Sequence, residues 1–463
     1  MTVVAELQLG PLLAGFLPAQ RWFAGRGRRI EAVRVASLAR VHDGPPALVH
    51  VVAEVAYADG PPERYAVPIG LDTQAPPGLA DAGRVLGTVA PEGPGGTSLV
   101  AYDALADSRL TLILLARIAE GAEAGGLRFR CAVPARGGLA AGSARMMSAE
   151  QSNTSVVFDD RLIMKLFRRV QDGINPELEL TRVLAGRGFT GVAEPLGWIE
   201  DDTATVGMLQ PFLAGSVEGW KLATERSSAA AAQGGGAGFE AEARELGVTT
   251  ARLHLALAAG LGTVEADADA AAATAARRRA ELAETVALAP HLARHVPRIE
   301  ALFDAADVRG TALQRVHGDY HLGQVLRAAD GQWIVLDFEG EPARPIPERR
   351  LPDSPLRDVA GMLRSFDYAA SFPLMEGEGA GDGAGEVMAR WARAARSAFL
   401  DGYFETVGDS ALQRQLAAYE IEKALYEVRY EARYRPHWLA IPLGGIDRLL
   451  APKDAKGGRD VHE

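Results

Sequence analysis

One segment of the chain decides its fold: Val316-His317-Gly318-Asp319-Tyr320-His321-Leu322-Gly323-Gln324-Val325-Leu326, followed by Ile334-Val335-Leu336-Asp337-Phe338-Glu339. Its two apolar runs are separated by Asp330-Gly331, a dipeptide that tolerates two successive positive φ angles, so the segment predicts a hairpin with a two-residue turn. In that register Gln324 lies opposite Asp337, and both side chains converge near Asp319. Amide and carboxylate oxygens are ligands that magnesium prefers, so we expect a magnesium site here.

The order of these polar side chains indicates phosphoryl transfer. In protein kinases an Asp of the catalytic loop accepts the proton of the attacking hydroxyl, and an amide and a second Asp further along the chain hold the metal. Asp319, Gln324 and Asp337 follow that order, and Glu339 is a further candidate metal ligand. His-Gly-Asp alone is also compatible with an ordinary turn around a buried histidine. Together with the hairpin and the second acid, it favours a kinase-type centre that uses ATP and Mg²⁺.

A kinase also needs a cation on the phosphates of its nucleotide, and Lys165 is the candidate. It lies near the end of the second strand of a predicted hairpin. A helix is predicted to begin at Asn175-Pro176, because Asn is a good N-cap and Pro suits the first turn. This helix carries Glu179, which we expect to pair with Lys165, and Glu177 is the competing choice. An edge-strand lysine that serves solubility is the alternative interpretation of Lys165.

Two further segments are expected to contact the nucleotide. No Gly-x-Gly-x-x-Gly motif precedes Lys165, and a polar segment that by itself predicts only a turn takes that place. Its hydroxyl, amide and backbone N–H groups are expected to cover the phosphates. The candidates are Ser152, Asn153, Thr154 and Ser155. Residues 205–213 form a predicted hinge strand whose backbone bonds adenine, with the candidates Gln210, Phe212 and Leu213.

A late helix over residues 418–434 is the expected acceptor site. At about 100° per residue, Ile421, Leu425, Val428 and Ala432 form one apolar stripe that faces the core. The opposite face combines tyrosines with charged side chains, which suits a ligand with apolar ring faces and many hydroxyls. The candidate substrate-binding residues are His321, Lys423, Tyr426, Glu427 and Tyr430. The alternative is a packed helix whose tyrosines fill a gap beneath the cap.

Other residues near the motif are expected to support it rather than to react. His317 belongs to the catalytic loop, and Asp358 is expected to brace this loop without touching the substrate. Glu339 and Glu341 are expected to supply a second metal ligand or a salt bridge to Arg349 or Arg357.

Composition excludes several classes of protein. The formal net charge of −11 opposes nonspecific binding to nucleic acid, whose phosphates would be repelled. A single cysteine, Cys131, excludes an intramolecular disulfide. The first twenty residues lack the pattern of a signal peptide, and no apolar run reaches the roughly eighteen residues of a membrane span. We therefore expect a cytoplasmic protein without a membrane partner.

Periodicity along the 463 residues predicts an α+β, bilobal, protein-kinase-like fold. Residues 1–135 form a sheet-rich N-terminal cap, residues 136–214 the nucleotide-binding lobe with its hinge, and residues 215–463 a mostly helical lobe with the catalytic loop and the acceptor site. Two tracts rich in Gly, Ala and acids, 227–238 and 376–386, are expected to be mobile surface insertions.

Several stretches together resemble the maltokinases, which are sugar kinases of the aminoglycoside-phosphotransferase-like superfamily. The resemblance is carried by 20–26, 149–156, 316–326, Asp337-Phe338-Glu339-Gly340-Glu341-Pro342, 353–361 and 419–438. His-Gly-Asp belongs to the whole superfamily, whereas Asp-Phe-Glu-Gly-Glu-Pro and the Tyr/Glu-rich helix are narrower.

This resemblance implies that the chain makes maltose 1-phosphate from maltose and ATP, with Asp319 as the base, and that it takes part in α-glucan synthesis. It also suggests trehalose synthase as a partner that supplies maltose. A glucosamine kinase of the same fold is one alternative. A catalytically silent partner of a sugar-isomerising enzyme is another, and the intact set Lys165, Asp319, Gln324 and Asp337 argues against it.

Overall fold

The computed structural model describes residues 3–90, 97–132, 138–147, 152–236, 238–341, 346–377 and 383–451. The chain forms two compact units, one made of residues 1–182 and 193–214 and the other of residues 183–192 and 215–463. The first unit is rich in sheet and the second is mostly helical, so the predicted α+β class is confirmed. Among the described residues, no helix has the length and apolar character needed to cross a membrane.

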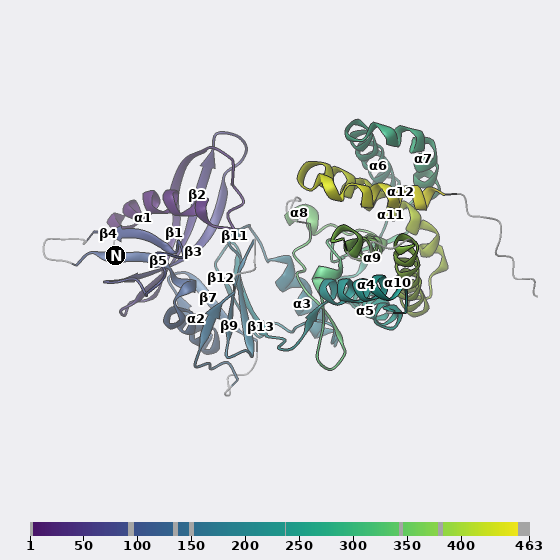
Figure 1. Ribbon diagram of the computed structural model, residues 1–463. Helices are drawn as coiled ribbons and strands as arrows, with labels where there is room; N and C mark the ends of the chain where they lie inside the picture. Colours follow the sequence, from purple (N-terminus) through teal and green to yellow (C-terminus); the bar gives the residue numbers. More distant parts are fainter. Residues whose placement is uncertain are drawn as a thin grey trace, which may run out of the picture. The chain divides into compact units, whose positions relative to one another are not determined.

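The N-terminal sheet has the order β1-β2-β3-β5-β4 and is antiparallel throughout. Its strands are β1 (Ile30–His42), β2 (Ala47–Tyr57), β3 (Glu63–Asp72), β4 (Val85–Val89) and β5 (Leu99–Asp103). Helix α1 (Val3–Phe16) lies against this sheet (Figure 1). Alternate residues of β2 serve two cores: Val49 and Val51 pack with α1, whereas Leu48 and Val52 pack with the second sheet. Both faces of this sheet are therefore buried.

The second sheet has seven strands in the order β6-β7-β12-β13-β10-β9-β8. They are β6 (Glu123–Ala124), β7 (Leu127–Cys131), β8 (Ala144–Met146), β9 (Thr154–Phe158), β10 (Leu162–Leu166), β12 (Gly197–Glu200) and β13 (Thr205–Pro211). Helix α2 (Ser108–Glu120) and residues 176–182 of helix α3 (Pro176–Gly186) belong to the same unit. Since β5 is in the first sheet and β6 is in the second, the chain changes sheets between these two strands. This change comes well ahead of the boundary expected at residue 135.

A buried ion pair joins the two sheets. Arg168, which lies just after β10, bonds Asp103 at the end of β5 at 2.9 Å, and both side chains are fully buried. The same guanidinium lies 4.5 Å from the ring of Trp22, and its Nε donates to the hydroxyl of Thr154. Strand β11 (Arg169–Val170) then pairs with β3. The Trp22 segment and the start of β9 are therefore parts of one interior.

The helical unit contains α4 (Gly219–Gln233), α5 (Glu240–Leu261), α6 (Ala268–Leu288), α7 (Val296–Ala305), α8 (Ile346–Arg349), α9 (Leu356–Met375), α10 (Ala384–Val407), α11 (Ser410–Tyr434) and α12 (Ala440–Leu450) (Figure 1). Its small strands are β14 (Val217–Glu218), β15 (Thr263–Glu265), β16 (Ala312–Gln314), β17 (Val325–Arg327) and β18 (Trp333–Val335). Helices α5 and α10 cross closely at Gly247. A Cβ at this position would lie only 2.1 Å from the carbonyl oxygen of Phe399, so the crossing requires a glycine.

The first low-complexity tract is not the mobile insertion that we expected. Residues 227–233 continue α4, because alanine has the highest helix propensity. Ser227 is fully buried, and its hydroxyl donates to the carbonyl of Ala369 in α9 at 2.8 Å. In the second tract, residues 378–382 lie outside the described residues, and α10 begins at Ala384.

Candidate active site

The loop that carries Asp319 is held from behind by Asp358, near the start of α9. One carboxylate oxygen of Asp358 accepts from the backbone N–H of His317 at 2.8 Å, and the other from that of Gly318 at 2.9 Å. Gly318 adopts a φ of 86°, a conformation that glycine takes readily. Asp358 therefore braces the loop, as predicted, and the side chain of Asp319 remains a quarter exposed.

The carboxylate of Asp358 belongs to a buried polar chain. It lies 3.0 Å from Nε2 of His254, whose Nδ1 lies 2.9 Å from the hydroxyl of Tyr403. Burial by itself raises the pKa of Asp358, but the contacts with His254, His317 and Gly318 outweigh burial and leave the pKa below its ordinary value. Asp358 is therefore a carboxylate that acts as a hydrogen-bond acceptor.

His317 connects the loop of Asp319 to the strand that leads to Asp337. Its Nε2 lies 2.7 Å from the carbonyl oxygen of Leu336, which only accepts, so Nε2 carries the proton. Nδ1 then accepts from the backbone N–H of Asp319 at 3.3 Å. His317 therefore supports the loop by linking the backbone of Leu336 to that of Asp319.

The hairpin brings Gln324 and Asp337 together, although its register differs from the predicted one. Val325 pairs with Val335, one residue away from the expected alignment. The prediction of a two-residue turn is wrong because, of Asp330 and Gly331, only Gly331 has a positive φ. A longer turn closes between Ala328 and Gln332. Nε2 of Gln324 nevertheless donates to Oδ2 of Asp337 at 3.0 Å.

Asp337 has a left-handed backbone with a φ of 60°. Such a conformation is strained for a residue other than glycine, and strained residues gather at functional sites. The contact with Gln324 uses the amide nitrogen, so the donor set still contains an amide oxygen and a carboxylate, which suit magnesium. For Glu339, the third candidate ligand, the carbonyl oxygen accepts from Arg349 at 3.1 Å.

In the sheet-rich unit, Lys165 lies in β10 and pairs with a glutamate of α3. Oε2 of Glu177, the competing choice, lies 2.6 Å from Nζ, and this contact favours Glu177 over Glu179 as the partner. Residues two apart on a helix point in different directions, and the backbone N–H of Glu177 is fixed by the side chain of Asn175 at 2.8 Å. Glu177 is also buried, so the pair is shielded from water.

The expected phosphate-covering segment is mostly buried. Ser152 is exposed, but Asn153, Thr154 and Ser155 are buried. The hydroxyl of Thr154 accepts from Nε of Arg168 at 2.8 Å, so it serves the junction of the two sheets. This structural role was not visible from a segment that predicted only a turn.

The hinge strand forms as β13, but part of its hydrogen-bonding capacity is already used. The backbone N–H of Phe212 donates to the carbonyl of Arg161 at 2.8 Å, and its carbonyl accepts from Ala214 at 3.0 Å. The backbone N–H of Phe212 is therefore not available to adenine, whereas its carbonyl oxygen keeps a second lone pair. The side chain of Gln210 donates to the carbonyl of Ala193, and Leu213 follows the strand.

A cavity of about 170 Å³ lies beside the catalytic loop in the helical unit. Its lining comes from the loop, from α6, α9 and α11, and from the segment after Asp337. The residues are Glu281, Gly318, Tyr320, Glu341, Arg357, Gly361, Tyr419, Glu422, Lys423 and Tyr426. Nζ of Lys423 lies 3.8 Å from Oδ1 of Asp319, so two predicted site residues from distant parts of the chain meet here. Burial, together with the Glu341 carboxylate, raises the pKa of Tyr426.

Only part of the expected acceptor face of α11 is open. Glu427 is buried and bonds Nε of Arg364 at 2.9 Å, so it is not a solvent-facing sugar ligand. The reason is that α11 packs against α9 as well as α6, which buries part of the face that was expected to be open. Tyr430 is exposed and stacks on Tyr426 with ring centroids 6.3 Å apart. His321 does not line the cavity; its Nδ1 accepts from the backbone of Gly323, and burial lowers its pKa.

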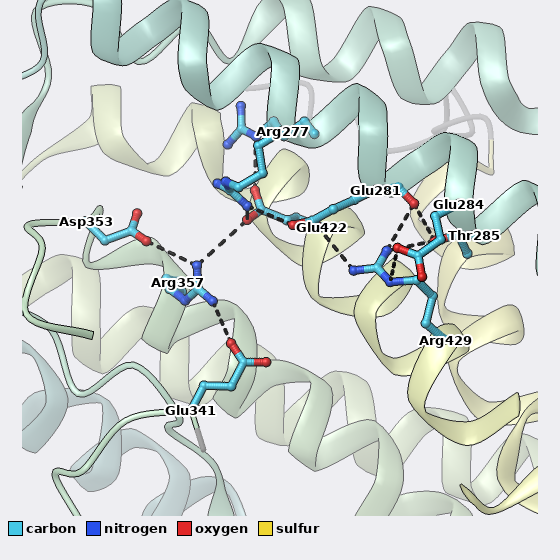
Figure 2. Close-up of polar contacts among 10 residues, drawn as sticks. Arg277, Glu281, Glu284, Thr285, Glu341, Asp353, Arg357, Glu422 and Arg429 are labelled. Carbon is cyan, nitrogen blue, oxygen red and sulfur yellow. Dashed lines mark hydrogen bonds and ion pairs between the residues drawn. The ribbon is translucent and has the colours of Figure 1, made fainter. Parts of the chain in front are cut away.

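The acids that line the cavity are matched by arginines (Figure 2). Glu422 bonds Arg277 at 2.5 Å and Arg278 at 3.0 Å. The predicted salt bridge between Arg357 and Glu341 is confirmed at 3.2 Å. Three arginines hold the pKa of Glu422 at about 2 in spite of burial, which raises it.

Glu281 completes this set of paired acids. It lies 3.4 Å from Arg277 and 3.5 Å from Arg429 (Figure 2). Sequence reasoning missed Glu281 and Glu422 as lining residues. The regular polar pattern of the two helices contains no signal that distinguishes these two glutamates from solvated ones.

Comparisons with known proteins agree with this geometry. Residues 16–107 match the maltokinase N-terminal cap domain, and residues 144–419 match the phosphotransferase enzyme family. A glucosamine kinase of Mycolicibacterium smegmatis is 30% identical over 327 residues, which are 66% of this chain and 79% of that protein. A glucosamine kinase of Streptacidiphilus jiangxiensis is 30% identical over 325 residues, 66% of this chain and 73% of that protein.

Solved structures extend the likeness to nearly the whole chain. A glucosamine kinase in complex with glucosamine, ADP and inorganic phosphate has a TM-score of 0.70 and 26% identity, and the match covers 96% of this chain and 99% of that one. A second crystal form gives a TM-score of 0.71 and 27% identity over 95% and 99% of the two chains. The predicted kinase-like fold with a sheet-rich cap is thereby confirmed.

Proposed function

Since the chain belongs to the phosphotransferase enzyme family, we propose that it is a sugar kinase that transfers the terminal phosphoryl group of ATP to the anomeric hydroxyl of maltose. Asp319 orients this hydroxyl and accepts its proton. Lys165, aligned by Glu177, holds phosphate oxygens. Gln324, Asp337 and Glu339 supply hard oxygen donors for Mg²⁺, which neutralises the charge on the phosphates when it is bound.

One observation supports a neutral sugar over glucosamine: the cavity beside Asp319 offers no unmatched carboxylate among its described lining residues. Glu281, Glu341 and Glu422 are each paired with an arginine, and Lys423 adds a positive charge 3.8 Å from Asp319. An aminosugar carries an ammonium group at neutral pH, which needs a carboxylate and is repelled by a lysine. A neutral sugar needs only hydroxyl partners, which charged side chains that are already paired still provide.

The size of the cavity fits this proposal as well. About 170 Å³ suits one hexose ring, so the second ring of a disaccharide would extend out of the cavity. Tyr430 and Tyr434, with ring centroids 4.9 Å apart, follow Tyr426 along α11 and are exposed. Aromatic rings commonly support the apolar faces of sugars, so this side of α11 supplies a surface for the second ring.

The experiment is a sugar panel with MgATP that contains maltose, glucosamine, glucose and an aminoglycoside, with products identified by ³¹P NMR. We expect maltose 1-phosphate as the main product. A preference for glucosamine, or the absence of any sugar phosphate, would overturn the proposal. Lys423→Met gives a sharper test, because loss of this charge should raise the rate with glucosamine relative to maltose.

The likeness to the maltokinase cap domain also supports a role in maltose metabolism. We propose that the enzyme acts in the cytoplasm and that trehalose synthase, which makes maltose from trehalose, is its partner enzyme. Co-purification from a cell extract tests the physical association. Addition of purified trehalose synthase to the kinase should leave the rate of phosphorylation of free maltose unchanged.

A further inference from the structure

A second cavity in the helical unit is separate from the acceptor site. It encloses about 620 Å³ and is lined by residues 187–191, by one side of α5 and by the β17–β18 hairpin. It shares no lining residue with the cavity beside Asp319. A volume of this size is within the range of pockets that bind small organic ligands.

The lining of this cavity is basic although the chain as a whole is acidic. Arg187, Arg252 and Arg327 line it, with Glu245 as the acid opposite them. Arg327 is paired with Glu245 at 2.5 Å and lies 5.2 Å from the ring of Trp333. Arg187 and Arg252 are exposed and have no side-chain ion pair within the described part of the chain. Two arginines without a side-chain ion pair in the described part of the chain therefore line one cavity on a protein of net charge −11.

The remaining lining residues indicate what kind of anion fits. Thr190, Thr249 and Gln332 contribute hydroxyl and amide groups, which suit a polyhydroxyl ligand. The ring of Trp333 is buried and its Nε1 donates to the carbonyl of Glu242, so it is a wall rather than a stacking surface. The cavity is also far larger than a single phosphate ion requires.

Backbone hydrogen bonds connect this cavity to the magnesium ligands. The N–H of Val335 in β18 donates to the carbonyl of Gly191 at 2.8 Å, and the N–H of Leu336 donates to the carbonyl of Gln324 at 2.9 Å. Asp337 follows directly. A ligand held between residues 187–191 and the hairpin would therefore press on the strand that positions Asp337.

We propose that this cavity, which we call the arginine pocket (Arg187, Arg252, Arg327 and the residues around them), binds a phosphorylated sugar. Arg187 and Arg252 bind the phosphate in the forked geometry that guanidinium groups favour. The threonines and Gln332 bind the sugar hydroxyls. Because the ligand contacts the hairpin, its binding changes the magnesium dependence of the kinase.

The first experiment measures binding by calorimetry with glucose 6-phosphate, inorganic phosphate and glucose as probes. The variant Arg187→Gln/Arg252→Gln should lose at least about tenfold in affinity for glucose 6-phosphate, as expected for loss of charge-assisted hydrogen bonds. The matched control Arg390→Gln/Arg393→Gln removes two exposed arginines from α10 and should bind like the wild type. Melting temperatures check that both variants are folded.

Three results would overturn the proposal. One is equal affinity of wild type and the pocket variant, which would place the probe elsewhere, such as in the acceptor site. Another is equal affinity for inorganic phosphate and glucose 6-phosphate, because the sugar would then contribute nothing. The third is an absence of binding to wild type at millimolar probe. A magnesium titration of turnover, with and without glucose 6-phosphate, then tests the effect on Asp337 in the wild type and the pocket variant.

Discussion

The loop around Asp319 is fixed through its backbone N–H groups, so the carboxylate of Asp319 can be altered without disturbing the loop. The loop is fixed by Asp358 and His317 through backbone groups, and the Asp319 side chain is a quarter exposed. Asp319→Asn should therefore leave the melting temperature near that of wild type and lower turnover by about a thousandfold, as expected for loss of a positioned base. Steady-state kinetics and thermal unfolding measure the two quantities.

The control for this substitution is Glu300→Gln, an exposed acid on α7 in the same unit. It removes the same charge and should change neither quantity. Turnover of Asp319→Asn within about tenfold of wild type would contradict the assignment of the base, given the usual size of this effect.

The partner of Lys165 offers a matched pair of variants on one helix. Glu177 contacts Nζ at 2.6 Å, and Glu179 lies two residues further along α3. Glu177→Gln should lower kcat/KM for ATP by at least about tenfold, because the ammonium loses the charge that aligns it. Glu179→Gln should have the smaller effect. The reverse order of the two effects would show that the pair in the structure is not the one used in catalysis.

At the scale of elements, the catalytic loop depends on one carboxylate of α9. Asp358→Ala leaves one buried and one partly buried backbone N–H group without their acceptor, and His254 also loses a contact. We expect a loss of roughly 3 kcal/mol in the free energy of unfolding, as for buried donors left unsatisfied. Asp358→Asn keeps an acceptor oxygen and should recover part of that loss. Urea unfolding of the two variants and wild type provides the measurement.

The β17–β18 hairpin shows what a local sequence pattern can and cannot specify. The pattern predicted the two strands and the approach of Gln324 to Asp337. It missed the register by one residue, because Asp330 does not adopt the positive φ that a two-residue turn requires. The side chains still meet, since a glutamine is long enough to reach across this shift. Register depends on turn geometry, which a single dipeptide does not fix.

Helix α11 shows the other limit of prediction. Three of the four residues of its predicted apolar stripe, Ile421, Leu425 and Val428, are in the core, and Ala432 is half-buried. The opposite face looked open because it carries acids, but Glu420 and Glu427 are buried against arginines of α10 and α9. Burial of an acid depends on whether a distant helix supplies a cation. The periodicity of one helix contains no such information.

At the scale of the molecule, the buried acid–arginine network makes stability depend on pH. The folded-state pKa of Glu422 is about 2, below its ordinary value of 4.5. The folded state therefore binds this proton less tightly than the unfolded state, and the contribution is complete above pH 4.5 and lost as pH falls toward 2. A shift of this size corresponds to about 3 kcal/mol at neutral pH.

Comparison of wild type with Glu422→Gln measures this contribution. The gap in the free energy of unfolding should be widest above pH 4.5 and should narrow between pH 4.5 and 2, where wild type also gains the proton. Denaturant unfolding at a series of pH values gives the gap. A gap that is constant over this range would mean that Glu422 contributes by packing alone.

At the scale of the whole chain, periodicity indicates a sheet-rich part and a helical part but not the residue at which the first sheet ends. The sheet-rich and helical parts follow from periodicity, whereas the end of the cap does not, because residues 123–131 have the same alternating pattern as the cap strands. Only pairing with β12 assigns them to the second sheet. The role of Arg168 was equally hidden, since its partners Asp103 and Trp22 are far away in the sequence.

The left-handed backbone of Asp337, with a φ of 60°, has a consequence for protein engineering. Glycine adopts this conformation without a penalty, so Asp337→Gly should be more stable than Asp337→Ala by about 1 kcal/mol, and neither should retain magnesium-dependent turnover. Thermal unfolding and kinetics of the two variants check this expectation. A library selected for thermostability without an activity assay should therefore enrich glycine at residue 337, and would return well-folded proteins that no longer hold the metal.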